Sequence, residues 1–364
     1  MRSVVSKSIR RCFAVVPLML ASAFVMPETS LSEDLVINGT TVADAELWAA
    51  AQEDGSFTLY SSQSPTANEA MSTAFNEATG LTVDTVPATA ARLYERILSE
   101  AGAGVLNADL IWITDAALIA GLATNNVLAS YEPLGYDKLA AEFKAPNNGP
   151  YFIPLQAVNA LSYNKELVAE ADVPKKWSDL LDPKWADRKL GWTQVTGGSN
   201  WSRELWLRET YGQEYWEGIA RQKPIISDSN AVTTELLSRG EVMVAVGLPA
   251  SVAQAAADGA PVEVIFPEDG MIAYNQYVAL AASAKKPNAA KVFLNWILSP
   301  GGQEAIALKL GNYPVMEGAP GPLVGERTLP SRDEALIVQP NEENLLKLRE
   351  QYQEEWLRMM GITG

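Results

Sequence analysis

A short run of glycines and hydroxyl residues is one place where this chain could hold an anion. Thr196-Gly197-Gly198-Ser199 directly precedes a segment with helical spacing that begins at Asn200. Glycines let the backbone approach an oxyanion, hydroxyls donate hydrogen bonds, and the first turn of a helix carries a partial positive charge. The same residues also fit an ordinary Gly-Gly turn in which Ser199 caps the helix. Trp201 follows the turn and could contact a ligand there, although most tryptophans of this region are expected to be core.

Serines and aspartates lie at other points where a strand is expected to end and a helix to begin. Ser62 and Ser64 follow the first strand of an alternating region, with Ser61 at its end. Their hydroxyls could donate to a ligand or simply cap the next helix. Asp115 and Asp228 could pair with a ligand amine, and both are also suited to capping the helices that follow them.

Two larger side chains complete this set of candidates. Arg92 follows the second expected strand and could hold an anion with two parallel hydrogen bonds, or remain a solvated helix residue. Tyr274 lies near an expected crossing between two halves of the chain, where it could contact a ligand or pack in a hinge. The chain has a net negative charge, which opposes the binding of an anion at long range. Salt screens this repulsion beyond about 8–10 Å, so hydrogen-bond donors close to the ligand can still make anion binding favourable.

The composition excludes much of enzymology. The 364 residues include no histidine and one cysteine, Cys12, which rules out His-based catalysis, Ser-His-Asp and Cys-His nucleophiles and His-containing metal sites. There is no G-x-S-x-G elbow, and nothing local proposes a carboxylate pair for glycosidase chemistry. The 28 Lys and Arg against 44 Asp and Glu give a net charge of −16, which disfavours nucleic acid and anionic membranes as partners. With 48% hydrophobic residues the chain can bury a sizeable core.

Residues 1–23 have the features of a cleaved export signal. Four basic residues precede an apolar run at 13–20 and the small-residue pattern Ala21-Ser22-Ala23. The apolar stretch contains Pro17 and is shorter than the roughly 20 residues that span a bilayer, which disfavours a membrane anchor. Arg10-Arg11 loosely matches a twin-arginine signal, so the export route stays open. Cleavage near Ala23 would remove Cys12 and four positive charges, taking the net charge from −16 to −20.

The elements that must position these candidates alternate between strand and helix. In the first half we expect strands at 57–60, 81–86 and 109–113, separated by helices at 44–52, 68–78, 91–101 and 116–123. Such alternation favours a mainly parallel sheet, with ligand groups at the carboxyl ends of its strands.

The second half repeats this alternation after an extended segment at 153–163, which we expect to cross between two units. Helices are expected at 200–209, 213–222 and 230–238 and a strand at 242–246, with 261–266 and 274–281 as strands that return to the first unit. A helix at 288–298 should end at Ser299-Pro300-Gly301-Gly302, and 318–330 should be a surface loop. The apolar stripe within 341–360 should pack on the body, or else meet a partner.

Several segments, taken in order, resemble one known family. AAQEDGSFTLYSS (50–62), RLYERILSEAGAGVLNAD (92–109), LSYN (161–164) and WSDLLDPKW (177–185) match its first part. RGEVMVAVG (239–247), PNAAKVFLNWILSPGGQ (287–303) and Tyr313-Pro314-Val315 continue the order. The chain thus resembles the bacterial extracellular solute-binding proteins of ABC importers, nearest to the ferric-ion-binding branch.

This resemblance implies an α/β, two-lobed periplasmic-binding-protein fold of type II with two hinge-crossing strands, closing on a ligand between the lobes. The implied N-terminal lobe comprises 24–152 and 275–330, and the C-terminal lobe 153–274. Residues 331–364 would form a helical segment that packs on the body.

The sequence departs from the ferric branch at the metal ligands. That branch holds iron with an adjacent tyrosine pair, a carboxylate and often a histidine, but the tyrosine-pair position here is Gly247-Leu248-Pro249-Ala250. Ser64 falls where the histidine would lie, and Thr114, next to Asp115, falls where the carboxylate would lie. Fe³⁺ prefers anionic oxygen ligands, which this loop does not provide. The branch also binds a synergistic anion at the position of Thr196–Ser199, and this part is better preserved.

We therefore expect a binding protein and not an enzyme: a periplasmic component of an ABC importer that captures a small organic anion. A phosphonate, a phosphate ester, a carboxylate or a zwitterionic aminophosphonate would fit, the last using Asp115 or Asp228 for its amine. A ferric-ion-binding protein with unusual ligands, a polyamine or cation binder and an exported hydrolase are the alternatives. No cofactor is expected, and the expected partners are the solute and the permease transmembrane subunits, with the protein itself a monomer.

Overall fold

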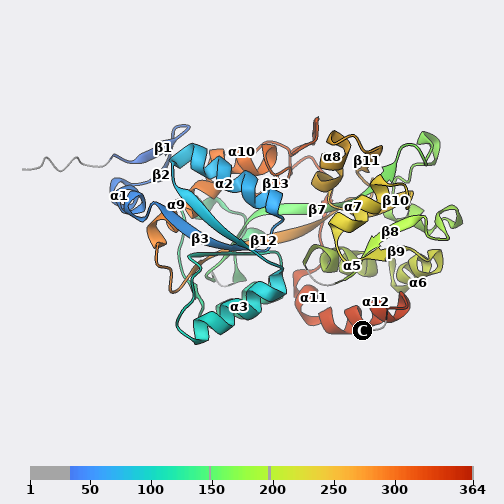
Figure 1. Cartoon of the computed structure of the whole chain (residues 1–364), viewed down its shortest axis with the longest axis horizontal. Helices are drawn as coiled ribbons and strands as arrows, with labels where there is room; N and C mark the ends of the chain where they lie inside the picture. Colours follow the sequence, from blue (N-terminus) through green and yellow to red (C-terminus); the bar gives the residue numbers. More distant parts are fainter. Residues whose placement is uncertain (1–32, 147–148, 196–197, 363–364) are drawn as a thin grey trace, which may run out of the picture. The chain divides into compact units, whose positions relative to one another are not determined.

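The computed structural model describes residues 33–146, 149–195 and 198–362 (Figure 1). The expected signal at 1–23 lies outside these residues, as do Thr196 and Gly197 of the expected anion turn. Across the described residues, we find no helix with the length and apolar character that a membrane crossing requires.

The first lobe is built on parallel strands that alternate with helices, as the sequence predicts. Strand β3 (Ser56–Ser61) pairs in parallel with β4 (Thr82–Pro87) and β5 (Leu110–Ile113). The intervening helices are α2 (Pro65–Thr79), α3 (Ala90–Gly102) and α4 (Ala116–Thr124). All four residues of β5 are buried, because helices cover both faces of a parallel sheet.

Local capping explains where α2 begins and ends. The Ser64 hydroxyl accepts a hydrogen bond from the Ala67 amide, and Pro65 occupies the first helical position. Gly80 ends the helix with a φ of 77°, a left-handed conformation that glycine adopts without a steric penalty. The carboxyl end of β3 therefore leads directly into a helix N-terminus.

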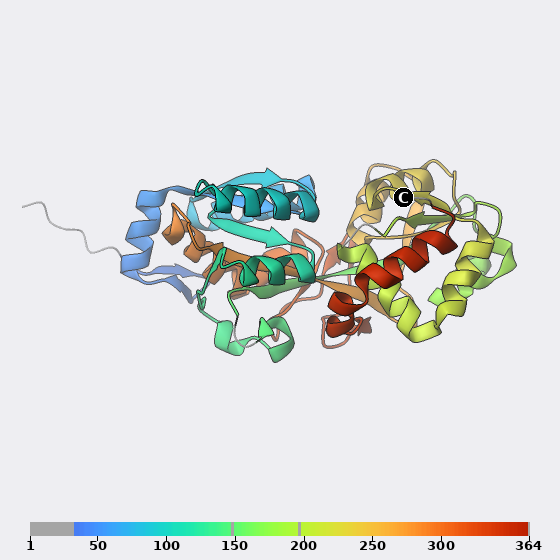
Figure 2. The ribbon, with the colours of Figure 1, turned by 90° about the horizontal axis from the view of Figure 1, so that it is seen from below.

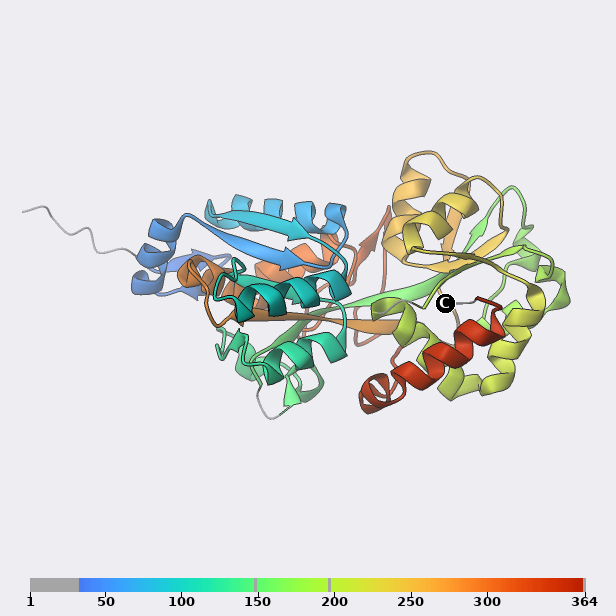
Figure 3. The same ribbon diagram turned by 60° about the horizontal axis from the view of Figure 1, so that its bottom comes forward.

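Two long strands connect the lobes. Strand β7 (Phe152–Asn164) pairs antiparallel with β12 (Met271–Ala281), with Tyr274 opposite Ala157. The N-terminal half of β7 and the C-terminal end of β12 belong to the first-lobe sheet, in which Tyr277 to Leu280 of β12 pair with β5. The other half of β7 pairs with second-lobe strands. In Figure 3 the two strands lie side by side where they run between the lobes.

The second lobe repeats the arrangement with its own strands and helices. Strand β10 (Val244–Gly247) pairs with β7 and with β8 (Leu190–Thr193), which pairs with β9 (Ile225–Ser227). The helices are α5 (Gly198–Tyr211), α6 (Gln213–Gln222), α7 (Asn230–Ser238) and α8 (Pro249–Ala257).

One expected strand connection is wrong. Strand β11 (Val262–Ile265) does not return to the first lobe but pairs antiparallel with residues 161–164 of β7 inside the second lobe. Only β12 returns. The hydrophobic pattern identifies a strand, but its pairing partner lies about 100 residues away and leaves no local signal.

The chain after β12 packs first on the first lobe. Helix α9 (Pro287–Leu298) is almost wholly buried, and its Phe293 lies against Phe57 and Phe75. Ser299 ends α9, as predicted, but it also caps a further helix, α10 (Pro300–Leu308), in place of a turn alone. The expected loop at 318–330 contains a small hairpin of β14 (Leu323–Val324) and β15 (Arg327–Thr328).

The last segment runs from the crossing strands to the second lobe. Strand β16 (Ile337–Val338) pairs with β12, and α11 (Glu342–Lys347) and α12 (Arg349–Met359) follow. Figures 1 and 2 show α12, drawn in red, beside α5 and α6. Trp356 of α12 is fully buried in the second-lobe core, and its indole nitrogen donates to Glu204 at 3.0 Å.

Shorter elements complete the fold. They are α1 (Ala45–Asp54), the pair β1 (Leu35–Ile37) and β2 (Thr40–Ala43), β6 (Leu128–Ala129), β13 (Tyr313–Pro314) and several single 3₁₀ turns.

Candidate ligand-binding cleft

A cavity of about 370 Å³ opens between elements of both lobes, which is within the usual size range of small-molecule sites. Its walls come from the turns after β3 and β5, the crossing strands, the first turns of α2, α5, α7 and α8, and the segment before β13. The lining residues are Ser62, Gln63, Ser64, Ala67, Thr114, Ala157, Val158, Ser199, Ser229, Asn230, Leu248, Pro249, Ala250, Ser251, Tyr274, Gln276, Leu310, Gly311 and Asn312.

Helix N-termini border this cleft from both lobes. Ser64 caps α2, and in the second lobe Ser229 caps α7 by accepting from the Val232 amide at 3.3 Å. Helix α8 begins at Pro249, and Ser199 lies in the first turn of α5. Each N-terminus contributes roughly half a positive charge. None of the described residues that line the cleft is charged, so the helix N-termini are the sources of positive potential in its walls.

The turns after β3 and β5 meet at the first-lobe wall. The Ser62 hydroxyl oxygen lies 3.0 Å from the Thr114 amide, from which it accepts, and 3.3 Å from the Thr114 hydroxyl. Both residues were expected in the site, and the fold brings them together because β3 and β5 are neighbouring parallel strands.

The crossing strand β12 supplies the floor of the cleft. Tyr274 and Gln276 are two residues apart, so their side chains leave the same face of the strand. The Trp112 indole nitrogen donates to Gln276 Oε1 at 2.7 Å. Burial raises the pKa of the Tyr274 phenol well above its usual value, while a hydrogen bond from the Gln276 side chain acts in the opposite direction. The phenol is therefore neutral at physiological pH.

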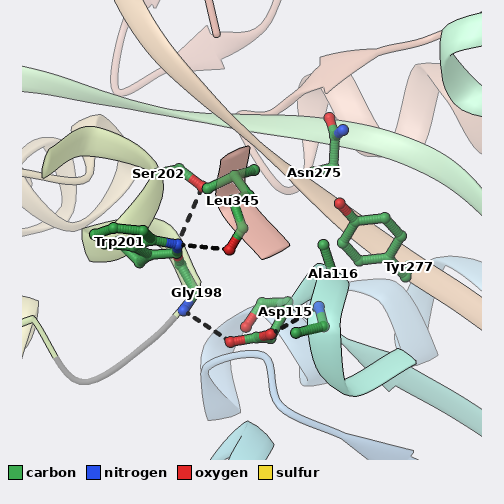
Figure 4. A pocket seen from close by; sticks show the side chains of 10 residues that line it. Asp115, Ala116, Gly198, Trp201, Ser202, Asn275, Tyr277 and Leu345 are labelled. Carbon is green, nitrogen blue, oxygen red and sulfur yellow. Dashed lines mark hydrogen bonds between the residues drawn. The ribbon is translucent and has the colours of Figure 1, made fainter. Parts of the chain in front are cut away.

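Asp115 lies beside the cleft and is already fully engaged. Its carboxylate caps α4 by accepting from the Ala117 and Leu118 amides, and it accepts from the Gly198 amide at 3.3 Å. Arg349 of α12 pairs with both of its oxygens. Figure 4 shows Asp115 and Gly198 facing each other across a small gap. The N-terminus of α5 thus contacts an anion that belongs to the protein itself.

Gly198 and Trp201 have structural tasks at this contact. Gly198 has a φ of 52°, and a Cβ there would lie 3.1 Å from the Thr114 carbonyl oxygen. Only glycine accommodates both the backbone angle and this approach. The Trp201 indole nitrogen donates to the Leu345 carbonyl at 3.0 Å, so the tryptophan contacts α11 (Figure 4) and does not line the cleft.

Two further candidates lie outside the cleft. Arg92 is exposed on α3, and Asp228 is exposed between β9 and the capping Ser229. The capping role that the sequence offered to Asp228 belongs to Ser229, one residue later. Thr196 and Gly197 lie outside the described residues.

Several lining residues were not anticipated from the sequence, including Gln63, Asn230, Ser251, Gln276 and Asn312. Two of them had a usable signal. Asn230 directly follows the strand-to-helix turn at Asp228, and Gln276 lies on the same strand face as Tyr274. Asn312 had none, because it reaches the cleft from an irregular segment.

A ferric-type metal site does not fit these donors. Within the parts of the chain that the structure describes, no three His, Cys, Asp or Glu side chains gather as a metal site. The described cleft lining offers one phenol and no carboxylate, whereas Fe³⁺ prefers several anionic oxygens.

Solved structures with the same architecture support the fold. An Agrobacterium tumefaciens substrate-binding protein of an ABC transporter matches with a TM-score of 0.71 and 16% identity over 84% of this chain and 95% of its own. Iron-bound HitA from Pseudomonas aeruginosa gives a TM-score of 0.67 and 22% identity over 83% and 99%. AfuA from Actinobacillus pleuropneumoniae, with fructose-6-phosphate bound, gives 0.67 and 16% over 84% and 99%. The expected two-lobed α/β architecture of type II is confirmed.

Sequence comparison assigns the family. The profile of the bacterial extracellular solute-binding proteins matches residues 70–325, and the chain belongs to that family. An uncharacterized protein of Haemophilus influenzae is 25% identical over 196 residues, which is 51% of this chain and 56% of that relative. The chain thus matches little more than half of the length of that relative.

Proposed function

We propose that this protein captures a small organic anion in the cleft and delivers it to the permease of an ABC importer. A phosphonate, a phosphate ester or a carboxylate is the ligand class. The observation that carries the proposal is the arrangement of the N-termini of α2, α7 and α8, with many hydroxyl and amide groups, around a described lining without a charged side chain. Fixed donors of this kind stabilise negative charge without a cationic side chain.

The same lining gives little support to an amine. Among its described residues there is no carboxylate to pair with an ammonium group, and Asp115 is committed to Arg349 and Gly198. Asp228 is exposed and outside the lining. Burying an unpaired ammonium in such a cleft is costly, which argues against polyamines and zwitterionic aminophosphonates.

The ferric alternative has the weaker support. One solved relative of this fold contains iron and another contains fructose-6-phosphate. The hydroxyl-rich cleft described above suits an organic phosphate, whereas the single neutral phenol of Tyr274 is a poor replacement for a set of anionic ligands.

Export completes the proposal. The family is extracellular, and residues 1–23 carry the features of a cleaved signal. We place the mature protein in the periplasm as a monomer that docks on the permease after it has closed on its ligand.

A ligand screen tests the proposed function. Mature protein would be screened by thermal shift against phosphonates, phosphate esters, carboxylates, polyamines and Fe³⁺, with hits measured by titration calorimetry. A ligand at 100 times its Kd adds about 2.7 kcal/mol to the free energy of unfolding, which raises the melting temperature by several degrees. A shift with organic anions is expected, whereas a shift with polyamines or Fe³⁺ alone would overturn the proposal.

Ser229 offers a matched pair of variants for the same test. Ser229→Asp and Ser229→Asn both keep a good N-cap for α7, but only aspartate adds a negative charge to the cleft. Anion affinity should fall at least about tenfold in Ser229→Asp and change little in Ser229→Asn. Equal affinity in the two variants would place the anion elsewhere.

A further inference from the structure

The cleft contains a buried amide whose orientation is unambiguous. Gln276 is 3% exposed, and its Oε1 accepts from the indole nitrogen of Trp112 at 2.7 Å. An indole N–H can only donate, so the amide oxygen must face Trp112. The two N–H donors of the same amide are left for the opposite side, where Gln276 lines the cleft.

Tyr274 lies on the same face of β12 and also lines the cleft. Burial raises the pKa of its phenol, so the group keeps its proton and its O–H can donate into the cleft.

A second amide, that of Asn230 in the second lobe, also has its oxygen turned toward the protein. The Thr193 hydroxyl donates to Asn230 Oδ1 at 3.0 Å, and Thr193 lies 2.8 Å from the Thr233 hydroxyl, with Ser227 next in this buried chain. Asn230 lines the cleft at the first position of α7. Its oxygen faces the protein, which leaves its N–H groups for a ligand.

The two serines that cap helices at the cleft also present hydrogen-bond donors to it. Ser64 and Ser229 each accept a hydrogen bond from a backbone amide of the helix that they cap, which uses one of the two lone pairs of the hydroxyl oxygen and leaves the O–H to donate. Four kinds of group from three walls thus present donors to the cleft, and the two amides turn their oxygens toward the protein.

We infer that the cleft selects fully deprotonated oxyanions and discriminates against the protonated form of the same ligand. This inference rests on the proposed function, favours the dianionic forms of its phosphate esters and phosphonates, and adds sulfonates and sulfate esters, which carry no proton, to the small organic anions that the cleft should bind. A singly protonated phosphate brings one P–O–H donor. The amides of Gln276 and Asn230 turn their oxygens toward the protein, and the described lining has no carboxylate, so this donor meets only the neutral hydroxyl and amide oxygens that remain, such as those of Ser199 and Asn312.

The test compares two esters of one shape, glycerol 3-phosphate and glycerol 3-sulfate, by calorimetry on the mature protein. At about pH 5 both are monoanions, and only the phosphate carries a proton, since its second pKa is about 6. The sulfate should then bind at least about tenfold more tightly than the phosphate. At about pH 8 the phosphate is a dianion, and its affinity should rise by at least about tenfold, whereas that of the sulfate stays constant.

Gln276→Glu replaces an amide donor on the floor of the cleft with a carboxylate acceptor. A carboxylate there can accept the proton of the phosphate ester but repels a sulfate, so the preference measured at about pH 5 should shift toward the phosphate. Asn230→Asp should act in the same direction, and it suits the first turn of α7 if the first variant fails to fold. Gln52→Glu adds the same charge on the exposed face of α1, far from the lining, and should leave the preference unchanged.

The outcomes separate the two proposals. If wild-type protein binds neither ester nor any other organic anion, the proposed function fails and this inference fails with it. If it binds both esters equally at about pH 5, or keeps the same preference in Gln276→Glu and Asn230→Asp, the inference is overturned while the proposed function stands.

Discussion

Arg349 Nη1 lies 2.9 Å from one carboxylate oxygen of Asp115 and 2.7 Å from the other, although 234 residues separate the two side chains in sequence. Asp115 caps α4 in the first lobe, and Arg349 begins α12, whose Trp356 is buried in the second lobe. The C-terminal segment therefore connects the lobes beside the cleft, in addition to the two crossing strands.

Removing this connection should weaken the fold. In Arg349→Ala the Asp115 carboxylate, 5% exposed, loses its counter-charge, and we expect the free energy of unfolding to fall by about 2 kcal/mol. Urea unfolding measures the change. Arg358→Ala, on an exposed position of the same helix, should stay within about 0.5 kcal/mol. Equal losses in the two variants would mean that the ion pair has no particular role.

Gly198 should be intolerant of a side chain. In Gly198→Ala the positive φ costs about 1–2 kcal/mol, and the new Cβ presses on Thr114 across the lobes. Because the strain falls on the conformation in which the lobes touch, ligand affinity should fall about fivefold or more. Calorimetry with the best ligand of the screen gives the measurement. Gly102→Ala, at the end of α3 with open space around it, should bind like the wild type.

Tyr313 should make the protein sensitive to alkali. Its hydroxyl is buried without a hydrogen-bond partner, and burial raises the pKa of Tyr313 to about 12, from 10.0 in the unfolded chain. The folded state favours the neutral phenol, so its contribution is fully present below pH 10 and is lost as the pH rises toward about 12.

Tyr313→Phe tests this relationship. The variant removes an unsatisfied hydroxyl and should gain about 1 kcal/mol at neutral pH. Its loss of stability between about pH 10 and 12 should be shallower than that of the wild type, as followed by urea midpoints. If the stability of Tyr313→Phe falls with pH as steeply as that of the wild type, the loss of stability in alkali comes from other tyrosines. Tyr215 is one of these, because burial also raises its pKa.

Glu204 should be one of the most sensitive positions in the second lobe. Its fully buried carboxylate accepts from Arg203, Trp192 and Trp356. Glu204→Gln leaves the buried Arg203 guanidinium without a counter-charge, and we expect a loss of about 3–5 kcal/mol.

Limited proteolysis provides a second measurement for this variant, because α12 loses an acceptor for Trp356 and should be cleaved sooner. Glu217→Gln, on the exposed side of α6, is the control and should change little. A resistant α12 in Glu204→Gln would show that apolar packing alone holds the helix.

Much of the fold could be predicted because its signals are local. The caps at Ser64 and Asp115 and the stop at Gly80 lie within a few residues of the helices that they limit. The return of β12 followed from its hydrophobic pattern together with the family resemblance. The partner of β11 did not follow, because strand pairing depends on distant residues.

The candidate site was less accessible to prediction. Ser62 was placed in the cleft because it follows the end of a strand, and Thr114 because the family resemblance puts a ligand residue there. Asp115 and Trp201 were considered for a ligand, but the segment that contacts them, at Leu345 and Arg349, lies more than 140 residues away. No local pattern could show that these donors and acceptors were already taken.

The burial of Trp356 also bears on the order in which the molecule can be made. The second-lobe core includes this residue, and the first-lobe core includes Phe293 of α9, so neither lobe is encoded by one continuous early stretch. A growing chain can complete neither core until residues from its later part have been synthesised. Folding of the finished architecture is therefore a late event, and incomplete chains expose apolar surface that chaperones or proteases can recognise.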